Sequence, residues 1–105
     1  MLRLIIALLV INFNFGLCYA ANTIKLTVQT SSSEVAAIGL TYDGHKAGGL
    51  GKYYSSSGFK AGFFYHFGYR KSMFGQNYAC GSSFLDKDSV IDLIIDAKGC
   101  IPEIH

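Results

Sequence analysis

The sequence from Phe59 to Arg70, FKAGFFYHFGYR, holds the densest run of aromatic residues in the chain. Read with a period of two, one face is apolar and carries Ala61, Phe63, Tyr65, Phe67 and Tyr69. The other face carries Gly62, Phe64, His66, Gly68 and Arg70. This alternation, in residues of high β-propensity, predicts a strand. Its apolar face is wide enough to cover one side of a small core.

Alternating segments lie on both sides of this strand. The predicted strands are Thr23 to Thr30, Glu34 to Tyr42, Asn77 to Leu85, Val90 to Asp96 and Cys100 to Ile104. Val90 to Asp96 also allows a short helix, since Asp88 or Ser89 could cap it; the short β-branched run favours a strand. With frequent Gly, Ser and Asp turns, the pattern predicts an all-β fold, a small antiparallel β-sandwich or flattened barrel of five to seven short strands.

The first twenty residues have the composition of a cleaved signal peptide. A short basic start with Arg3 precedes an apolar run, and Cys18-Tyr19-Ala20 places small residues before a cut at Ala21. A membrane anchor would need about 20 apolar residues, and the run from Leu4 to Leu17 contains two asparagines. We therefore expect residues 1–20 to be a signal peptide and 21–105 to form a single secreted β domain, extracellular or periplasmic, with no stable membrane span. A lipoprotein modified on Cys18 is the other alternative.

Two cysteines, Cys80 and Cys100, remain after that cut. In an exported chain they predict one disulfide. A metal site is not expected, because the cysteines lack a CxxC spacing and a nearby histidine pair. No cofactor is expected either.

The segment from Gly44 to Gly58 contains five glycines. So many glycines disfavour a regular element, and the prediction is a long loop. Tyrosine combined with glycine, serine and lysine is typical of adaptable recognition surfaces. The candidate binding residues of this loop are His45, Lys46, Lys52, Tyr53 and Tyr54.

Several functional classes have little support. The formal net charge of +2 does not indicate nucleic-acid binding. A Ser-His-Asp set from Asp43, His45 and a serine of Ser55 to Ser57 lacks a nucleophile elbow, so the protein is not expected to be an enzyme. Asp86 and Asp88 suit a polar turn better than a calcium loop, which needs more ligands. The sequence around Lys52 fails the phosphate-loop pattern because Tyr53 follows the lysine.

The function that this composition favours is a secreted, non-enzymatic binding protein that recognises another protein or a glycan through the Gly/Tyr-rich loop. One alternative is an inhibitor of a secreted enzyme, since a small disulfide-linked domain with a projecting loop has the right build. The other alternative is a membrane-active toxin that uses Phe63, Phe64 and Tyr65.

Overall fold

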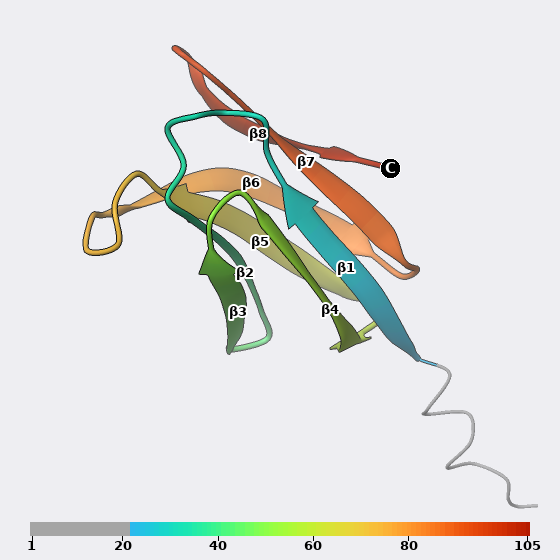
Figure 1. The fold of residues 1–105 in the computed structure, drawn as a ribbon. Coiled ribbons are helices and arrows are strands. Elements are labelled where there is room, and N and C mark those ends of the chain that lie inside the picture. The colour runs from blue at the N-terminus through green and yellow to red at the C-terminus, as the bar shows by residue number, and fades with distance from the viewer. Residues whose placement is uncertain (1–21) are drawn as a thin grey trace, which may run out of the picture.

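The computed structural model describes residues 22–105, which form eight strands joined by short turns (Figure 1). The expected signal peptide, its cleavage point and Cys18 lie outside the described residues. In order, the strands are β1 (Thr23–Gln29), β2 (Ala37–Tyr42), β3 (His45–Leu50), β4 (Tyr53–Lys60), β5 (Phe63–Arg70), β6 (Asn77–Leu85), β7 (Ser89–Asp96) and β8 (Gly99–Ile104). Residues 22–105 contain no helix that is long and apolar enough to cross a membrane.

The strands form two four-stranded sheets packed as a small sandwich. One sheet, the β1 sheet, has the order β4-β1-β7-β8, and the other, the β5 sheet, has the order β3-β2-β5-β6. Figure 1 shows the β7–β8 hairpin extending past the body of the sandwich at one end. The all-β sandwich expected from the alternation is therefore confirmed.

The core lies between the two sheets and uses the faces that the period-two pattern selects. Tyr65, Leu26, Ile91 and Val28 are fully buried. Aromatic rings fill the centre: the Tyr42 ring lies 4.5 Å from that of Tyr65, and the Phe59 and Tyr65 rings meet edge to face at 6.2 Å. Edge-to-face and offset pairs are favoured arrangements for aromatic rings, and the aromatic run supplies Phe59, Tyr65, Phe67 and Tyr69 to the core beside the aliphatic side chains of the other strands.

The prediction of a long loop from Gly44 to Gly58 is wrong. This segment forms β3 and most of β4, with a tight turn at Gly51, whose φ is 90°. The backbone of β3 pairs with β2 along its whole length, from Ala37–Leu50 to Tyr42–His45. The backbone entropy that glycine loses in a strand is about 0.5–1 kcal/mol per residue, and it is offset here by complete pairing with β2.

The predicted single strand from Phe59 to Arg70 is in fact two strand segments in different sheets. Phe59 and Lys60 end β4 in the β1 sheet, and Phe63 begins β5 in the β5 sheet. The chain crosses between the sheets at Ala61 and Gly62, whose φ of 86° suits glycine. The two strands of the supposed loop, β3 and β4, raise the number of strands to eight, where five to seven were expected.

One strand pairing is parallel. Leu26 to Gln29 of β1 lie beside Ser89 to Asp92 of β7 in the same direction, whereas every other pairing described for residues 22–105 is antiparallel. Alternation predicts which side chains face the core but not the direction of the neighbouring strand. The expected strand at Val90 to Asp96 is confirmed over its helical alternative.

The disulfide between Cys80 and Cys100 is confirmed. Cys80 lies on β6, at one edge of the β5 sheet, and Cys100 lies on β8, at one edge of the β1 sheet. The bond therefore joins the edges of the two sheets on one side of the sandwich.

Candidate functional site

The outer face of the β5 sheet is hollowed along a row of residues without bulky side chains. Gly39 of β2 pairs with Gly48 of β3 on one side and with Gly68 of β5 on the other. Gly68 pairs in turn with Ala79 of β6. The four residues Gly48, Gly39, Gly68 and Ala79 thus cross all four strands and form the floor of a groove of about 730 Å³, which we call the glycine groove.

The backbone of neighbouring strands lies too close to this row to leave room for side chains at its glycine positions. A Cβ atom placed on Gly48 would lie 2.5 Å from the Ile38 carbonyl oxygen and 2.8 Å from the Gly39 Cα. On Gly68 it would lie 2.9 Å from the Tyr78 carbonyl oxygen. Side chains normally stand clear of the backbone of the next strand, so only glycine fits at Gly48 and Gly68 without a shift of the neighbouring strand.

Two rows of side chains border the floor. On one side Thr41 pairs with Lys46 and with His66. On the other side Ala37 pairs with Leu50 and with Arg70, and Arg70 pairs with Asn77. The groove thus has a small-residue floor, one mixed basic rim, and a second rim that combines an exposed leucine with a guanidinium group.

The charge of the groove is positive. Lys46, Arg70 and the imidazole of His66 contribute to its lining, and none of the described residues that line it is an aspartate or glutamate. Arg70 is held in place by its Nε donating to Asn77 Oδ1 at 2.7 Å and by its Nη1 donating to the Met73 carbonyl at 3.1 Å. Since arginine has five N–H donors, this anchoring leaves donors for a ligand in the groove.

The neighbouring Lys71 is not among the described residues that line the groove. Its Nζ lies 3.3 Å from Glu34 Oε1 and 5.1 Å from the centre of the Tyr78 ring. The hydrogen bond and the charge of Glu34 raise the pKa of Lys71. We therefore do not count Lys71 among the groove's available cations.

An exposed aromatic pair lies on the same outer face, beyond His66. Phe64 and Phe84 pair across β5 and β6, and their ring centres are 5.4 Å apart. They are 62% and 51% exposed. The outer face of the β5 sheet therefore offers an apolar contact surface as well as a basic groove.

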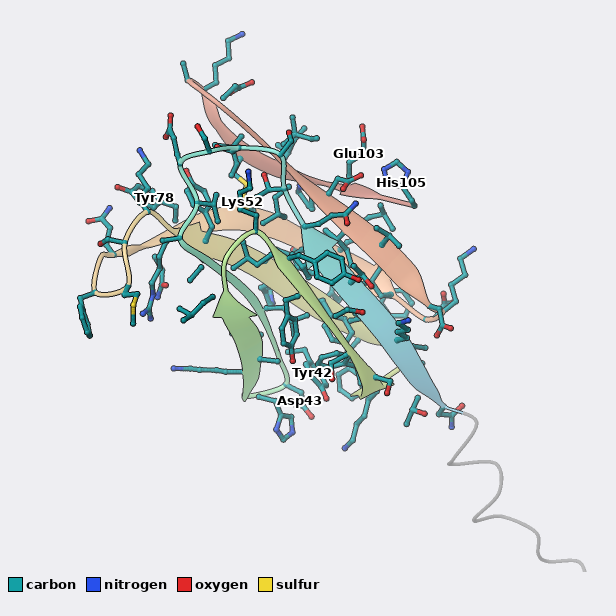
Figure 2. All side chains as sticks on the ribbon, in the orientation of Figure 1. Tyr42, Asp43, Lys52, Tyr78, Glu103 and His105 are labelled. Atoms are coloured by element: carbon teal, nitrogen blue, oxygen red, sulfur yellow. A yellow bond between two sulfur atoms is a disulfide. The ribbon has the colours of Figure 1, made fainter. Side chains whose placement is uncertain are left out.

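The structure does not bring the five predicted binding residues together. His45 and Lys46 begin β3, whereas Lys52, Tyr53 and Tyr54 follow its far end. Lys46 alone among the five lines the glycine groove. Figure 2 shows Lys52 at the turn that leads into β4, well away from the β2–β3 turn at Asp43.

Three other predicted binding residues, His45, Tyr53 and Tyr54, differ from one another in their contacts and exposure. The His45 ring lies 5.3 Å from that of Tyr42. Tyr53 is 62% exposed, whereas Tyr54 is half-buried against the core. Ser55, considered as a nucleophile, shares a hydrogen bond of 2.8 Å with Thr27 in the β1 sheet.

The membrane-active toxin alternative relied on three residues, Phe63, Phe64 and Tyr65, and these lie mostly in the interior. Tyr65 is fully buried and Phe63 packs against the core, so only Phe64 of the three is exposed. Burial raises the pKa of Tyr65 to about 12, with a smaller contribution from Tyr42, and its hydroxyl donates a hydrogen bond to the Lys60 carbonyl.

Sequence reasoning missed the floor of the groove. The available signal was a glycine at an outward position in each of three strands: Gly39, Gly48 and Gly68. An isolated glycine within a strand often marks close approach of another backbone or ligand. Only the register of the sheet aligns the three glycines into one row.

Comparison with known proteins finds no matching family model, no matching curated protein and no matching solved structure. The candidate site therefore rests on the geometry of this chain alone.

Proposed function

We propose that this protein is a secreted, non-enzymatic binding protein that holds an acidic segment of another protein in the glycine groove. The observation that carries the proposal is the coincidence of a concave, four-strand-wide floor with basic side chains on both rims and no carboxylate among the described residues that line it. A positive groove attracts negative partners and speeds their encounter. This replaces the Gly/Tyr-rich loop as the proposed binding surface.

A protein segment suits the groove better than a glycan. Sugar rings are commonly held against exposed aromatic faces, but the exposed pair Phe64 and Phe84 is not among the described residues that line the groove. Phe67 and Tyr69 of β5, which lie beside the floor, are buried in the core. Tyr78 is stacked against Tyr69 at 5.1 Å. The accessible contacts are instead backbone, small side chains, cations and Leu50, which suit the carboxylates and aliphatic groups of a peptide.

The compartment in this proposal rests on the disulfide and on the composition of residues 1–20. Disulfides persist in oxidising compartments, and Cys80 and Cys100 are bonded. N-terminal sequencing of the exported protein should give Ala21 as the first residue. A chain that retains residues 1–20, or that carries a lipid on Cys18, would contradict the secreted form.

The binding proposal is tested with a fluorescent oligoglutamate peptide and fluorescence anisotropy at low salt. We expect Lys46→Glu to weaken binding about tenfold, because it places a like charge at the rim. Ala79→Phe places a large ring on the floor of the groove from an exposed position, and this variant should abolish peptide binding. Lys87→Glu is the matched control, since Lys87 is exposed in the β6–β7 turn and changes the net charge equally.

Equal weakening by Lys46→Glu and Lys87→Glu would mean that net charge, not the groove, governs binding, and would contradict the proposal. Failure of the wild-type protein to bind the peptide would also contradict it. If the peptide does not bind but a sulfated polysaccharide binds in a Lys46-dependent manner, the partner of the groove is a glycan.

A further inference from the structure

Three metal-ligating side chains gather on the outer face of the β1 sheet, on the opposite layer from the glycine groove. Asp92 of β7 and Glu103 of β8 are direct cross-strand partners, and His105 follows Glu103 by two positions on the same strand face. His105 Nε2 lies 2.9 Å from Asp92 Oδ2 and 3.3 Å from Glu103 Oε1. One ligand atom from each residue lies within 4.8 Å of the others, and Figure 2 shows Glu103 and His105 side by side.

The positions of these donors are fixed by bonds that do not involve the cluster itself. Gln29 of β1 donates from Nε2 to Asp92 Oδ1 at 2.7 Å, which leaves Oδ2 directed at His105. The backbone of His105 exchanges two hydrogen bonds with Val90, of 2.8 and 3.0 Å. Outer hydrogen bonds of this kind orient metal ligands and are often needed for full affinity.

The spacing of the donors matches a small divalent ion. In a tetrahedral zinc site with bonds of about 2.1 Å, adjacent ligand atoms lie about 3.4 Å apart. The two distances from His105 Nε2 are 2.9 and 3.3 Å, and all three ligand atoms lie within 4.8 Å of one another, so side-chain rotations are needed to place them around one ion. Two carboxylates and a neutral imidazole also carry the charge that a 2+ ion neutralises.

We propose that Asp92, Glu103 and His105 form a binding site for a divalent transition-metal ion, with Zn²⁺ as the ion that suits it best. Imidazole with carboxylates is a donor set that zinc accepts, whereas calcium and magnesium take oxygen ligands. Three protein ligands leave a fourth position for water. A shallow hollow of about 200 Å³, lined in part by Lys25, Ser89 and His105, gives solvent access beside the imidazole.

A protonated His105 that bridges the two carboxylates as an ion pair would give the same geometry. Zinc binding distinguishes a metal site from this ion pair. Zinc is titrated by isothermal calorimetry into the disulfide-bonded protein produced without a histidine tag. We expect one zinc per chain, and a loss of at least tenfold in affinity for His105→Ala and for Asp92→Asn. His105→Ala keeps the backbone hydrogen bonds to Val90, so the strand pairing should persist.

His45→Ala and His66→Ala are the matched controls, because they remove the other two histidines of the chain from exposed strand positions. Both should bind zinc as the wild type does. Gln29→Met should weaken zinc binding about tenfold through the lost orientation of Asp92. In spectra recorded by nuclear magnetic resonance, zinc should shift the imidazole signals of His105 and leave those of the other two histidines in place.

Three results would overturn the proposal. The first is absence of binding at zinc concentrations up to about 1 mM, the weakest affinity of interest. The second is equal affinity in the wild type and His105→Ala. The third is displacement of zinc by equimolar calcium, which would identify a carboxylate site without an imidazole ligand. None of these results bears on peptide binding at the glycine groove, which is on the other sheet.

Discussion

Replacement of Gly48 by alanine tests the close approach of β2 and β3 at the floor of the groove. The added Cβ would lie 2.5 Å from the Ile38 carbonyl oxygen and 2.8 Å from the Gly39 Cα, both in the paired strand β2. Carbon atoms in real structures do not approach backbone this closely, and neither neighbour is a flexible side chain. The strands must therefore separate or the sheet must flatten, which weakens the β2–β3 pairing.

The magnitude follows from two opposing contributions. Forcing an extra methyl group into a well-packed position costs about 1–3 kcal/mol. Replacing glycine by alanine in a strand gains about 0.5–1 kcal/mol from the lower backbone entropy of the unfolded chain. We therefore expect Gly48→Ala to lower the free energy of unfolding by about 1–2 kcal/mol.

Gly49 offers a matched control one residue away. A Cβ at Gly49 meets only the Tyr54 ring carbon Cδ1, at 3.4 Å, which is ordinary contact with a movable side chain. Gly49→Ala should therefore be neutral or stabilise the protein by up to about 1 kcal/mol. The two single-methyl changes should differ by roughly 2 kcal/mol although they are adjacent in the same edge strand.

The assay is urea denaturation of both variants with the disulfide intact, followed by circular dichroism. The chain contains no tryptophan, so far-ultraviolet dichroism or tyrosine emission reports unfolding. The reasoning is refuted if Gly48→Ala is as stable as Gly49→Ala. Equal stability would mean that β2 and β3 do not approach closely at Gly48, and the glycine floor of the groove would lose its structural basis.

Two further predictions concern tyrosines. Burial raises the pKa of Tyr65 to about 12 from 10.0, so the unfolded chain loses the hydroxyl proton at a lower pH than the folded chain does. The folded state therefore keeps its full stability below pH 10. It loses roughly 2–3 kcal/mol of that stability as the pH rises to about 12. Chemical denaturation across this range should show a steeper decline for the wild type than for Tyr65→Phe, and identical slopes would contradict the assignment. Tyr54→Ala should cost about 1–2 kcal/mol because the ring packs on the core, whereas exposed Tyr53→Ala should change stability by less than about 0.5 kcal/mol. Thermal melts compare the two, and a larger loss for Tyr53 would reverse their assigned roles.

The period-two alternation predicted most of the apolar interior, although Thr27 and Ser89 are also buried. Ile24, Leu26 and Val28 face the core as expected, and so do Tyr65, Phe67 and Tyr69 of the aromatic strand. Burial of one strand face is a local property, because successive side chains point to opposite sides. The disulfide was also predictable, since Cys80 and Cys100 are the two cysteines that follow residue 20 and have only one pairing.

The fate of the glycine-rich segment was decided by tertiary pairing. Five glycines between Gly44 and Gly58 indicate a loop when they are judged by local preference alone. In the structure, β2 supplies the partner for every residue of β3, and the glycines at the outer positions allow the close approach that this pairing requires. Local propensity does not account for the neighbouring strand, whose pairing compensates for the entropy cost of the glycines.

Both candidate sites depend on register, which the sequence does not reveal. Gly39, Gly48 and Gly68 are far apart in the chain and become one row only through the pairing of β3, β2 and β5. Asp92 and His105 meet only because β7 and β8 pair in a particular alignment. A shift of one residue in a strand would turn these side chains to the opposite face. The sequence therefore determined which residues are buried, and the tertiary structure decided which exposed residues act together.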